Sequence, residues 1–204
     1  MNEHDPREVA VLGGGAGARA VAADLATQGC SVRLWDLPRF FGGLEPLRQG
    51  KALAVSGMMQ ARAELALVTD DLVEACRGAE LICVVTQSLA HAEIGRALAG
   101  VVEPEQIVLV DPGSTGGALE IARELTDACA ACPTIIETAT LTHTARTVGS
   151  DGIMIRMRVG YVKAAALPAA RTGELIPGLK CLFPGLQAAR NVLESRCAGW
   201  RLQL

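Results

Sequence analysis

A glycine-rich turn near the start of the chain constrains the fold more than any other feature of the sequence. The stretch EVAVLGGGAGARAVAADLATQG contains a short apolar run, a cluster of glycines and a run with helical spacing, in that order. This order predicts a buried parallel strand, a tight turn and a helix. Gly13, Gly15 and Ala18 fit the pattern G-x-G-x-x-A, which is typical of the first turn in dinucleotide-binding folds.

The small residues of this turn suit the binding of a dinucleotide. Gly13 permits the tight turn, Gly15 lets a pyrophosphate approach the backbone, and Ala18 lets the helix pack closely on the strand. The helix N-terminus would then present unpaired N–H groups to the phosphates. A turn with only a packing role is the alternative. The predicted cofactor loop comprises Gly13, Gly14, Gly15, Ala16, Gly17 and Ala18.

An acidic residue stands where such a site requires one. Asp36 ends the second predicted strand, VRLWD, about twenty residues after the loop. Its carboxylate would accept hydrogen bonds from the adenosine ribose, which favours NAD, although the nearby Arg39 leaves NADP open. A methyltransferase usually has an acidic residue just before the first glycine, where this chain has VAVL. A short-chain dehydrogenase needs Y-x-x-x-K, and Tyr161 has Ala165 at that spacing.

Strand and helix patterns alternate along most of the chain. The predicted strands ELICVVT, QIVLVDPGS and PTIIETAT alternate with the predicted helices SLAHAEIGRALAG, opened by Ser88 as N-cap, and TGGALEIARELTDAC. This alternation predicts a doubly wound, mostly parallel α/β sheet of Rossmann type. KALAVSG and AELALVTD are predicted as two further strands, GIMIRMRVGYVKAAAL as one or two, and DDLVEACRGA as a helix capped by Asp70 or Asp71. LPRFFGGLEPLRQG is predicted as a loop because of its prolines and glycines.

The composition argues against several classes of protein. Hydrophobic residues make up 50% of the 204 residues, which is typical of a globular chain. A net charge of -3 gives no basic surface for nucleic acid. No apolar run approaches the ~20 residues of a membrane span, and no signal peptide is expected. We therefore predict a cytoplasmic protein whose seven cysteines are reduced. The CAAC stretch has no second cysteine pair, so no metal site is expected.

Several blocks of sequence, taken together and in order, resemble the octopine and nopaline (opine) dehydrogenase family. They are GGGAGARAVAADLATQG, LWDLPRF, LALVTDDLVEACRGAELICVVTQSLAH, IVLVDPGSTGGALE, IIETATLTHTAR and KAAALPA. The resemblance implies an N-terminal NAD-binding Rossmann domain followed by an α-helical substrate domain. It also implies the family's reaction, in which an amino acid and a 2-oxo acid condense to an imine that NAD(P)H reduces.

The resemblance implies positions for the nicotinamide and the substrate. Gln87 and Ser88 lie in the stretch similar to the loop that lines the family's nicotinamide pocket. Ser114 and Thr115, in DPGSTGG, could bind a substrate carboxylate at the carboxyl edge of the sheet; a turn with a helix cap is the alternative. His91, one turn into a helix, is expected to be structural.

Two residues at a strand end and two departures from the family pattern bear on the chemistry. Glu137 and Thr138 end a predicted strand and are weak candidates for catalysis; the alternative is that they satisfy backbone groups. The chain has Asp111 where the family commonly has Asn, and Thr86 and Gln87 where it has Pro-Ala. These departures alter the polarity near the predicted nicotinamide site and leave the substrate open.

The C-terminal stretch favours a truncated second domain. In the family, NVLE leads into a helix that carries an Asn and, further on, the His that acts as general acid and base. Here RCAGWRLQL follows Ser195, and no histidine follows His143. We expect a dinucleotide-binding domain over residues 1–185 and the start of the helical domain plus a divergent tail over 186–204. A sheet surface left exposed would favour a homo-oligomer.

Two functions remain open from the sequence. The first is an opine-type NAD(P)-dependent dehydrogenase that acts on CH–NH bonds. The second is an NAD(H)-binding module without turnover, or a decayed enzyme. A ketopantoate or glycerol-3-phosphate reductase would need a catalytic lysine, and neither Lys163 nor Lys180 has the matching motif around it.

Overall fold

The computed structural model describes residues 7–113, 116–128 and 132–197, and contacts within the chain divide it into two parts. The first part is formed by residues 1–83 and 143–157, and the second by residues 84–142 and 158–204. The predicted domain boundary at residue 185 stays a prediction.

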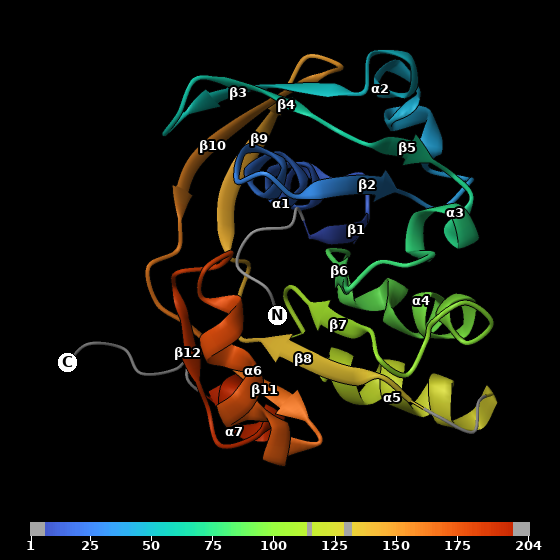
Figure 1. Cartoon of the computed structure of the whole chain (residues 1–204), viewed down its shortest axis with the longest axis vertical. Coiled ribbons are helices and arrows are strands. Elements are labelled where there is room, and N and C mark those ends of the chain that lie inside the picture. Colours follow the sequence, from blue (N-terminus) through green and yellow to red (C-terminus); the bar gives the residue numbers. More distant parts are fainter. Residues whose placement is uncertain (1–6, 114–115, 129–131, 198–204) are drawn as a thin grey trace. The chain divides into compact units, whose positions relative to one another are not determined.

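The first part contains two sheets with a helix between them (Figure 1). One sheet has the strand order β6-β1-β2-β5, and β2 pairs in parallel with both of its neighbours. The other has the order β4-β3-β10-β9, in which β3 pairs antiparallel with β4 and parallel with β10. The elements are β1 (Glu8–Leu12), α1 (Ala16–Thr27), β2 (Ser31–Trp35), the 3-10 turn η1 (Phe41–Gly43), α2 (Glu45–Gly50), β3 (Ala52–Gly57), β4 (Ala61–Glu64), β5 (Leu67–Thr69), α3 (Leu72–Cys76), β6 (Leu81–Val84), β9 (His143–Val148) and β10 (Gly152–Arg158).

Helix α1 is buried because both sheets of the first part pack on it. It contacts β1 and β2 on one side and β4 and β9 on another. Residues 18–25 of the helix are all buried, and four of these eight are alanines. Small side chains let both sheets approach the helix closely, and a helix that is apolar on most sides is stable only in such an interior position.

Two polar side chains lie inside this packing. Asp24 of α1 is 0% exposed and His143 of β9 is 3% exposed, and the His143 Nε2 atom lies 2.8 Å from the Asp24 Oδ2 atom. A buried polar group is costly unless it is hydrogen-bonded, and this contact gives each of the two side chains a partner. The pair therefore ties β9 to a helix that lies 119 residues earlier in the sequence.

The second part contains the sheet β7-β8-β11-β12 and the helices beside it. β8 pairs in parallel with β7 and antiparallel with β11, which in turn pairs in parallel with β12. The elements are η2 (Ser88–Ala90), α4 (His91–Leu98), β7 (Ile107–Val110), α5 (Gly117–Ala128), β8 (Thr134–Thr138), β11 (Val162–Leu167), η3 (Ala169–Arg171), α6 (Thr172–Leu179), β12 (Leu186–Ala188) and α7 (Val192–Cys197). The chain is thus a mixed α/β protein with largely parallel, Rossmann-like sheet, and the predicted fold class is confirmed.

The structure corrects the prediction of a loop over LPRFFGGLEPLRQG. This stretch contains η1 and the helix α2. Pro46 lies in the first turn of α2, where the missing N–H group has no partner in the helix anyway. The proline therefore starts this helix instead of preventing it.

Two further local predictions were wrong, and one strand was not predicted. AELALVTD forms two strands, because β4 pairs with β3 whereas β5 joins β2 in the other sheet. Strand β9 was not predicted, since HTARTV carries little apolar alternation apart from the buried His143. Ser88 does not cap α4, because Ala90 is the N-cap and no side chain makes a capping hydrogen bond there. The predicted cap of α3 is Asp71, whose Oδ1 accepts from the N–H groups of Val73 and Glu74.

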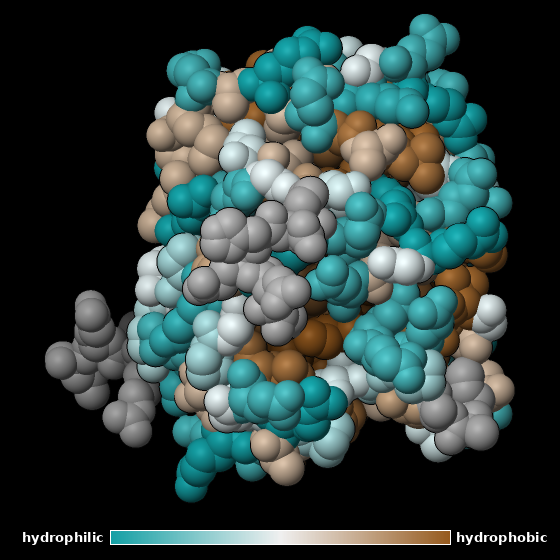
Figure 2. Space-filling view, in the orientation of Figure 1, coloured by the Kyte–Doolittle hydropathy of each residue, from teal (hydrophilic) through white to brown (hydrophobic). Residues whose placement is uncertain are grey.

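Polar residues cover much of the molecular face seen in Figure 2, with apolar residues between them. Several large apolar side chains are exposed, among them Phe40 and Met157 in the first part and Leu89 and Tyr161 in the second. Single exposed apolar side chains are normal in globular proteins. The predicted homo-oligomer therefore stays a prediction. Within the part of the chain that is described, no helix has the length and apolar character to cross a bilayer.

The buried pair between α1 and β9 can be tested by a double-mutant cycle. Replacing one partner leaves the other buried without its contact, so Asp24→Ala and His143→Ala should each lower the free energy of unfolding by about 3 kcal/mol. The double variant should cost clearly less than the sum of the two. Urea unfolding of the four proteins measures this, with Arg62→Ala, in an exposed ion pair with Glu64, as control. Strict additivity of the two losses would contradict the pairing.

Candidate dinucleotide site

The glycine loop joins the end of β1 to the start of α1. The Gly13 N–H donates to the Trp35 carbonyl oxygen at 2.7 Å, which ties the loop to the end of β2. Gly13 has a φ of 130°, a conformation that residues with a Cβ rarely adopt. Ala18 is fully buried in the packing of α1. The loop therefore has the tight turn and close helix packing that its sequence predicts.

The carboxylate of Asp36 lies directly against the loop. A Cβ added to Gly14 would lie 2.4 Å from the Asp36 Oδ2 atom and 3.3 Å from the Leu44 Cγ atom. The Gly14 N–H donates a hydrogen bond to the Asp36 carboxylate, and the Leu37 N–H donates another at 2.9 Å. The loop and the acid, separated in sequence, are thus in contact in the folded chain. The roles of both in binding a dinucleotide stay predictions.

The space above the helix N-terminus is open at Gly15. A Cβ added to this residue would meet nothing within 4 Å, in contrast to Gly14. Gly15 is the N-cap of α1, no side chain makes a capping hydrogen bond there, and the first turn has no acidic residue. A helix N-terminus with uncapped N–H groups and adjoining space is suited to an anion. The site therefore fits the pyrophosphate of a dinucleotide.

The surroundings of Asp36 affect its protonation. Burial raises the pKa of this half-buried carboxyl above its ordinary value, and the N–H groups of Leu37 and Gly14 and the charges of Arg19 and Arg39 oppose that rise. The carboxylate is therefore not fully compensated by the chain itself. Hydroxyl groups of a bound ribose would supply further donors to it.

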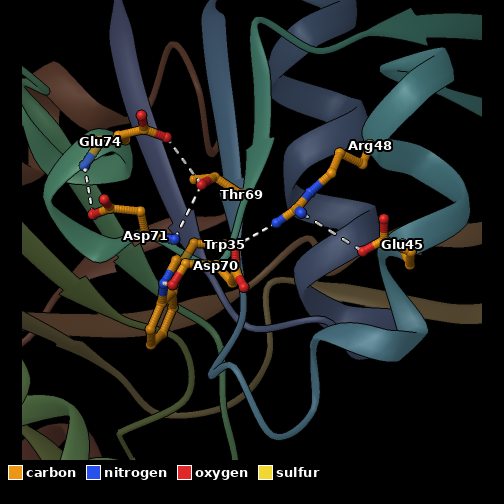
Figure 3. A network of polar contacts seen from close by, with 7 residues as sticks. All are labelled: Trp35, Glu45, Arg48, Thr69, Asp70, Asp71 and Glu74. Atoms are coloured by element: carbon orange, nitrogen blue, oxygen red, sulfur yellow. Dashed lines mark hydrogen bonds and ion pairs between the residues drawn. The ribbon is translucent and has the colours of Figure 1, made fainter.

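A polar network supports the segment before and after Asp36 (Figure 3). The Trp35 indole Nε1–H donates to the Asp70 carbonyl oxygen at 3.0 Å. The Arg48 guanidinium forms ion pairs with the carboxylates of Asp70 and Glu45. Its Cζ atom also lies over the Phe41 ring, 4.3 Å from the ring centroid. These contacts fix η1 and α2 next to the end of β2. Sequence reasoning missed this support because it assigned the segment to a loop.

The second part holds the other predicted site residues. Gln87 and Ser88 are exposed and lie at the start of η2, between β6 and α4. Ser114 and Thr115 lie outside the described residues. His91 begins α4 and is 1% exposed, with its Nδ1 atom 2.4 Å from the position of a Cβ added to Gly117. The ring is thus buried against the start of α5, and the structural role expected of His91 stays a prediction.

The strand-end acids of the second part bind other groups of the same part. The Asp111 carboxylate accepts hydrogen bonds from the Thr138 hydroxyl at 3.0 Å, the Thr142 N–H at 2.9 Å and the Thr142 hydroxyl. The Glu137 Oε2 atom accepts from the Ala118 N–H at 3.0 Å. The side chains of Asp111, Glu137, Thr138 and Thr142 are all buried. Asp111 thus holds the segment after β8, and Glu137 caps α5. A catalytic role for Glu137 or Thr138 stays a prediction.

Asp36 predicts a pH dependence of stability with a definite sign. Because its folded pKa lies above its ordinary value of 3.8, the carboxyl contributes stability below that value and loses it as pH rises through the folded pKa. The side chain introduced by Asp36→Asn is neutral at every pH. The melting temperature of this variant minus that of the unaltered chain should therefore increase as the pH rises above about 4. If Asp36→Asn also loses the hydrogen bond from the Gly14 N–H, the melting temperature of the variant shifts by the same amount at every pH. Thermal unfolding across this range measures the difference, and a flat difference would contradict the burial effect.

Comparisons with known proteins support a family resemblance. No family model matches the chain. An opine dehydrogenase from Arthrobacter sp. (strain 1C) is 31% identical over 192 residues, which cover 94% of this chain and 53% of that protein. The structure of octopine dehydrogenase with NADH and pyruvate superposes with a TM-score of 0.78 at 20% identity, covering 93% of this chain and 51% of the other.

Two further structures share the fold. Yersinopine dehydrogenase without ligand gives a TM-score of 0.77 at 13% identity over 96% of this chain and 50% of its own. The 2-dehydropantoate 2-reductase from Methylococcus capsulatus gives 0.67 at 16% identity over 92% of this chain and 58% of its own. The chain spans about half the length of the opine dehydrogenases that it matches. In sequence and fold the chain is opine dehydrogenase-like over nearly its whole length, and the predicted resemblance is confirmed.

Proposed function

We propose that the chain binds NAD(H) through the glycine loop and Asp36 and serves an opine-type, NAD(P)-dependent dehydrogenase reaction on CH–NH bonds. The observation that carries the proposal is the contrast between two adjacent glycines. Gly14 is closed off by Asp36, whereas Gly15 opens onto the uncapped start of α1. Such an arrangement suits a pyrophosphate next to a ribose-binding acid.

The residues of the loop would bind and orient the cofactor. When bound, a nicotinamide cofactor supplies hydride transfer to or from the carbon of a C–N bond. The N–H groups at the start of α1 would hold the pyrophosphate, and Asp36 would accept hydrogen bonds from the ribose hydroxyls. This acid favours NAD, and NADP remains open because of Arg39. Octopine dehydrogenase is known with NADH, and yersinopine dehydrogenase with NADP+.

The proposed substrates are an amino acid and a 2-oxo acid. Octopine dehydrogenase has been solved with pyruvate, with L-arginine and with agmatine, each together with NADH. In this chain Gln87 and Ser88 are proposed to line the nicotinamide site, and Ser114 and Thr115 to bind a substrate carboxylate. We further propose that the protein works in the cytoplasm and forms a homo-oligomer.

A nucleotide-binding module without turnover is the second candidate. It is favoured by the contacts of the strand-end residues, since Glu137 caps α5 and Thr138 donates to Asp111. Both side chains are buried, so neither is exposed to accept or donate a proton as it stands. NADH oxidation in the presence of pyruvate and an amino acid such as L-arginine separates the two candidates.

Titration of the purified chain with NADH tests the cofactor site. Gly15→Val places a side chain in the open space at α1 and should weaken NADH binding at least tenfold, or about 1.4 kcal/mol. Asp36→Ala should weaken NADH binding more than NADPH binding, because only NADH has both ribose hydroxyls free. Calorimetry measures each constant.

Gly100→Val is the matched control for this titration. A Cβ at Gly100 also meets nothing within 4 Å, so its folding cost should be similar and its NADH affinity should be that of the unaltered chain. The proposal fails if the unaltered chain binds neither nucleotide. It also fails if Gly15→Val binds NADH as tightly as the unaltered chain.

A further inference from the structure

One arginine joins three separate segments of the first part. Arg19 lies in the first turn of α1, and its Nε–H donates to the Gly14 carbonyl oxygen at 3.0 Å. Its Nη1 donates to the Ser150 carbonyl oxygen at 2.8 Å, and its Nη2 donates to the Gly43 carbonyl oxygen. These acceptors belong to the glycine loop, to the turn between β9 and β10, and to η1.

The charge of this arginine is buried without an ion pair. Arg19 is 6% exposed, and all three of its acceptors are neutral carbonyl groups. Among the residues described, no carboxylate lies within 4.0 Å of its nitrogens. Burying an unpaired charge is costly, and proteins normally pair it. The positive charge of Arg19 is therefore buried next to the glycine loop, which is suited to binding an anion.

Arg19 and Asp36 act on the two ends of the same residue. The Gly14 N–H donates to the Asp36 carboxylate, and the Gly14 carbonyl accepts from Arg19. The two charges also attract each other at longer range. The Asp36 carboxylate and the Arg19 guanidinium thus fix the orientation of Gly14. The next residue is Gly15, beside which the space at the N-terminus of α1 is open. The direction of the Gly15 and Ala16 N–H groups depends on this restraint.

We propose that Arg19 is a positioning residue of the dinucleotide site, which holds the glycine loop in its binding conformation and contributes its charge to the affinity for the diphosphate. The inference rests on the proposed function. It assigns two effects to Arg19, one present in the chain alone and one present only with nucleotide. Either effect can be measured without the other.

The first effect is read from amide hydrogen exchange of the chain without nucleotide. Arg19→Met removes the three hydrogen bonds, so exchange should accelerate in segments 13–17, 41–44 and 149–152 together. Arg33→Met is the matched control, because Arg33 also donates to several backbone carbonyls and pairs with Glu8, but at the end of α3. Its effect should be confined to residues near Glu8 and α3. Thermal unfolding confirms that each variant is folded.

The second effect is read from NADH affinity as a function of ionic strength. Arg19→Met should bind NADH at least tenfold more weakly, and its affinity should depend less on salt than that of the unaltered chain. Arg19→Lys keeps the charge but cannot reach three carbonyls with one planar fork. It should therefore restore the salt dependence while exchange in the three segments stays fast. A purely structural role would not produce this separation between the two variants.

Unchanged exchange in the three segments of Arg19→Met would overturn the positioning role, whatever nucleotide does. NADH affinity within twofold of the unaltered chain would overturn the contribution to binding. If the unaltered chain binds no NADH, the proposed function and the nucleotide role of Arg19 are both refuted, while the exchange result still reports on the loop contacts alone.

Discussion

The burial of helix α1 between two sheets is the constraint on which the first part depends. A helix covered on two sides needs small side chains, and α1 supplies alanines along its buried stretch. It also needs every polar group in that interior to find a partner. Arg19 and Asp24 meet this need with carbonyl groups and with His143. Since both sheets hold the helix, its N-terminus and the glycine loop have a fixed place.

The loop and its acid could be predicted because their signals are local. The glycines, the strand before them and Asp36 lie within about thirty residues, the range over which the spacing of the motif can be recognised in a sequence. The contacts of Arg19 could not be predicted in the same way. Ser150 is 131 residues away, and no spacing rule connects an arginine to a particular backbone carbonyl. Strand β9 was not predicted because its one buried side chain is that of His143, and a histidine does not give the alternation of apolar residues by which strands are recognised.

Polar residues at strand ends limit what a sequence can reveal about a site. Asp111, Glu137 and Thr138 follow or end parallel strands, which is where ligands bind in this class of fold. The same position also requires polar groups to satisfy helix N-termini and connecting segments. Asp111 and Glu137 both have such partners here. The same residue types serve to bind a ligand and to satisfy backbone groups, so only the three-dimensional contacts distinguish these two roles.

The order in which the first part is completed has a consequence for its synthesis. Its strands β9 and β10 come from residues 143–157, after an intervening stretch that belongs to the second part. At about 5–20 residues per second, a ribosome makes β9 several seconds or more after it has made α1. Until then, the emerging chain carries an alanine-rich helix that lacks its contacts with β9. Chaperones that recognise apolar segments would therefore have a defined interval in which to bind it.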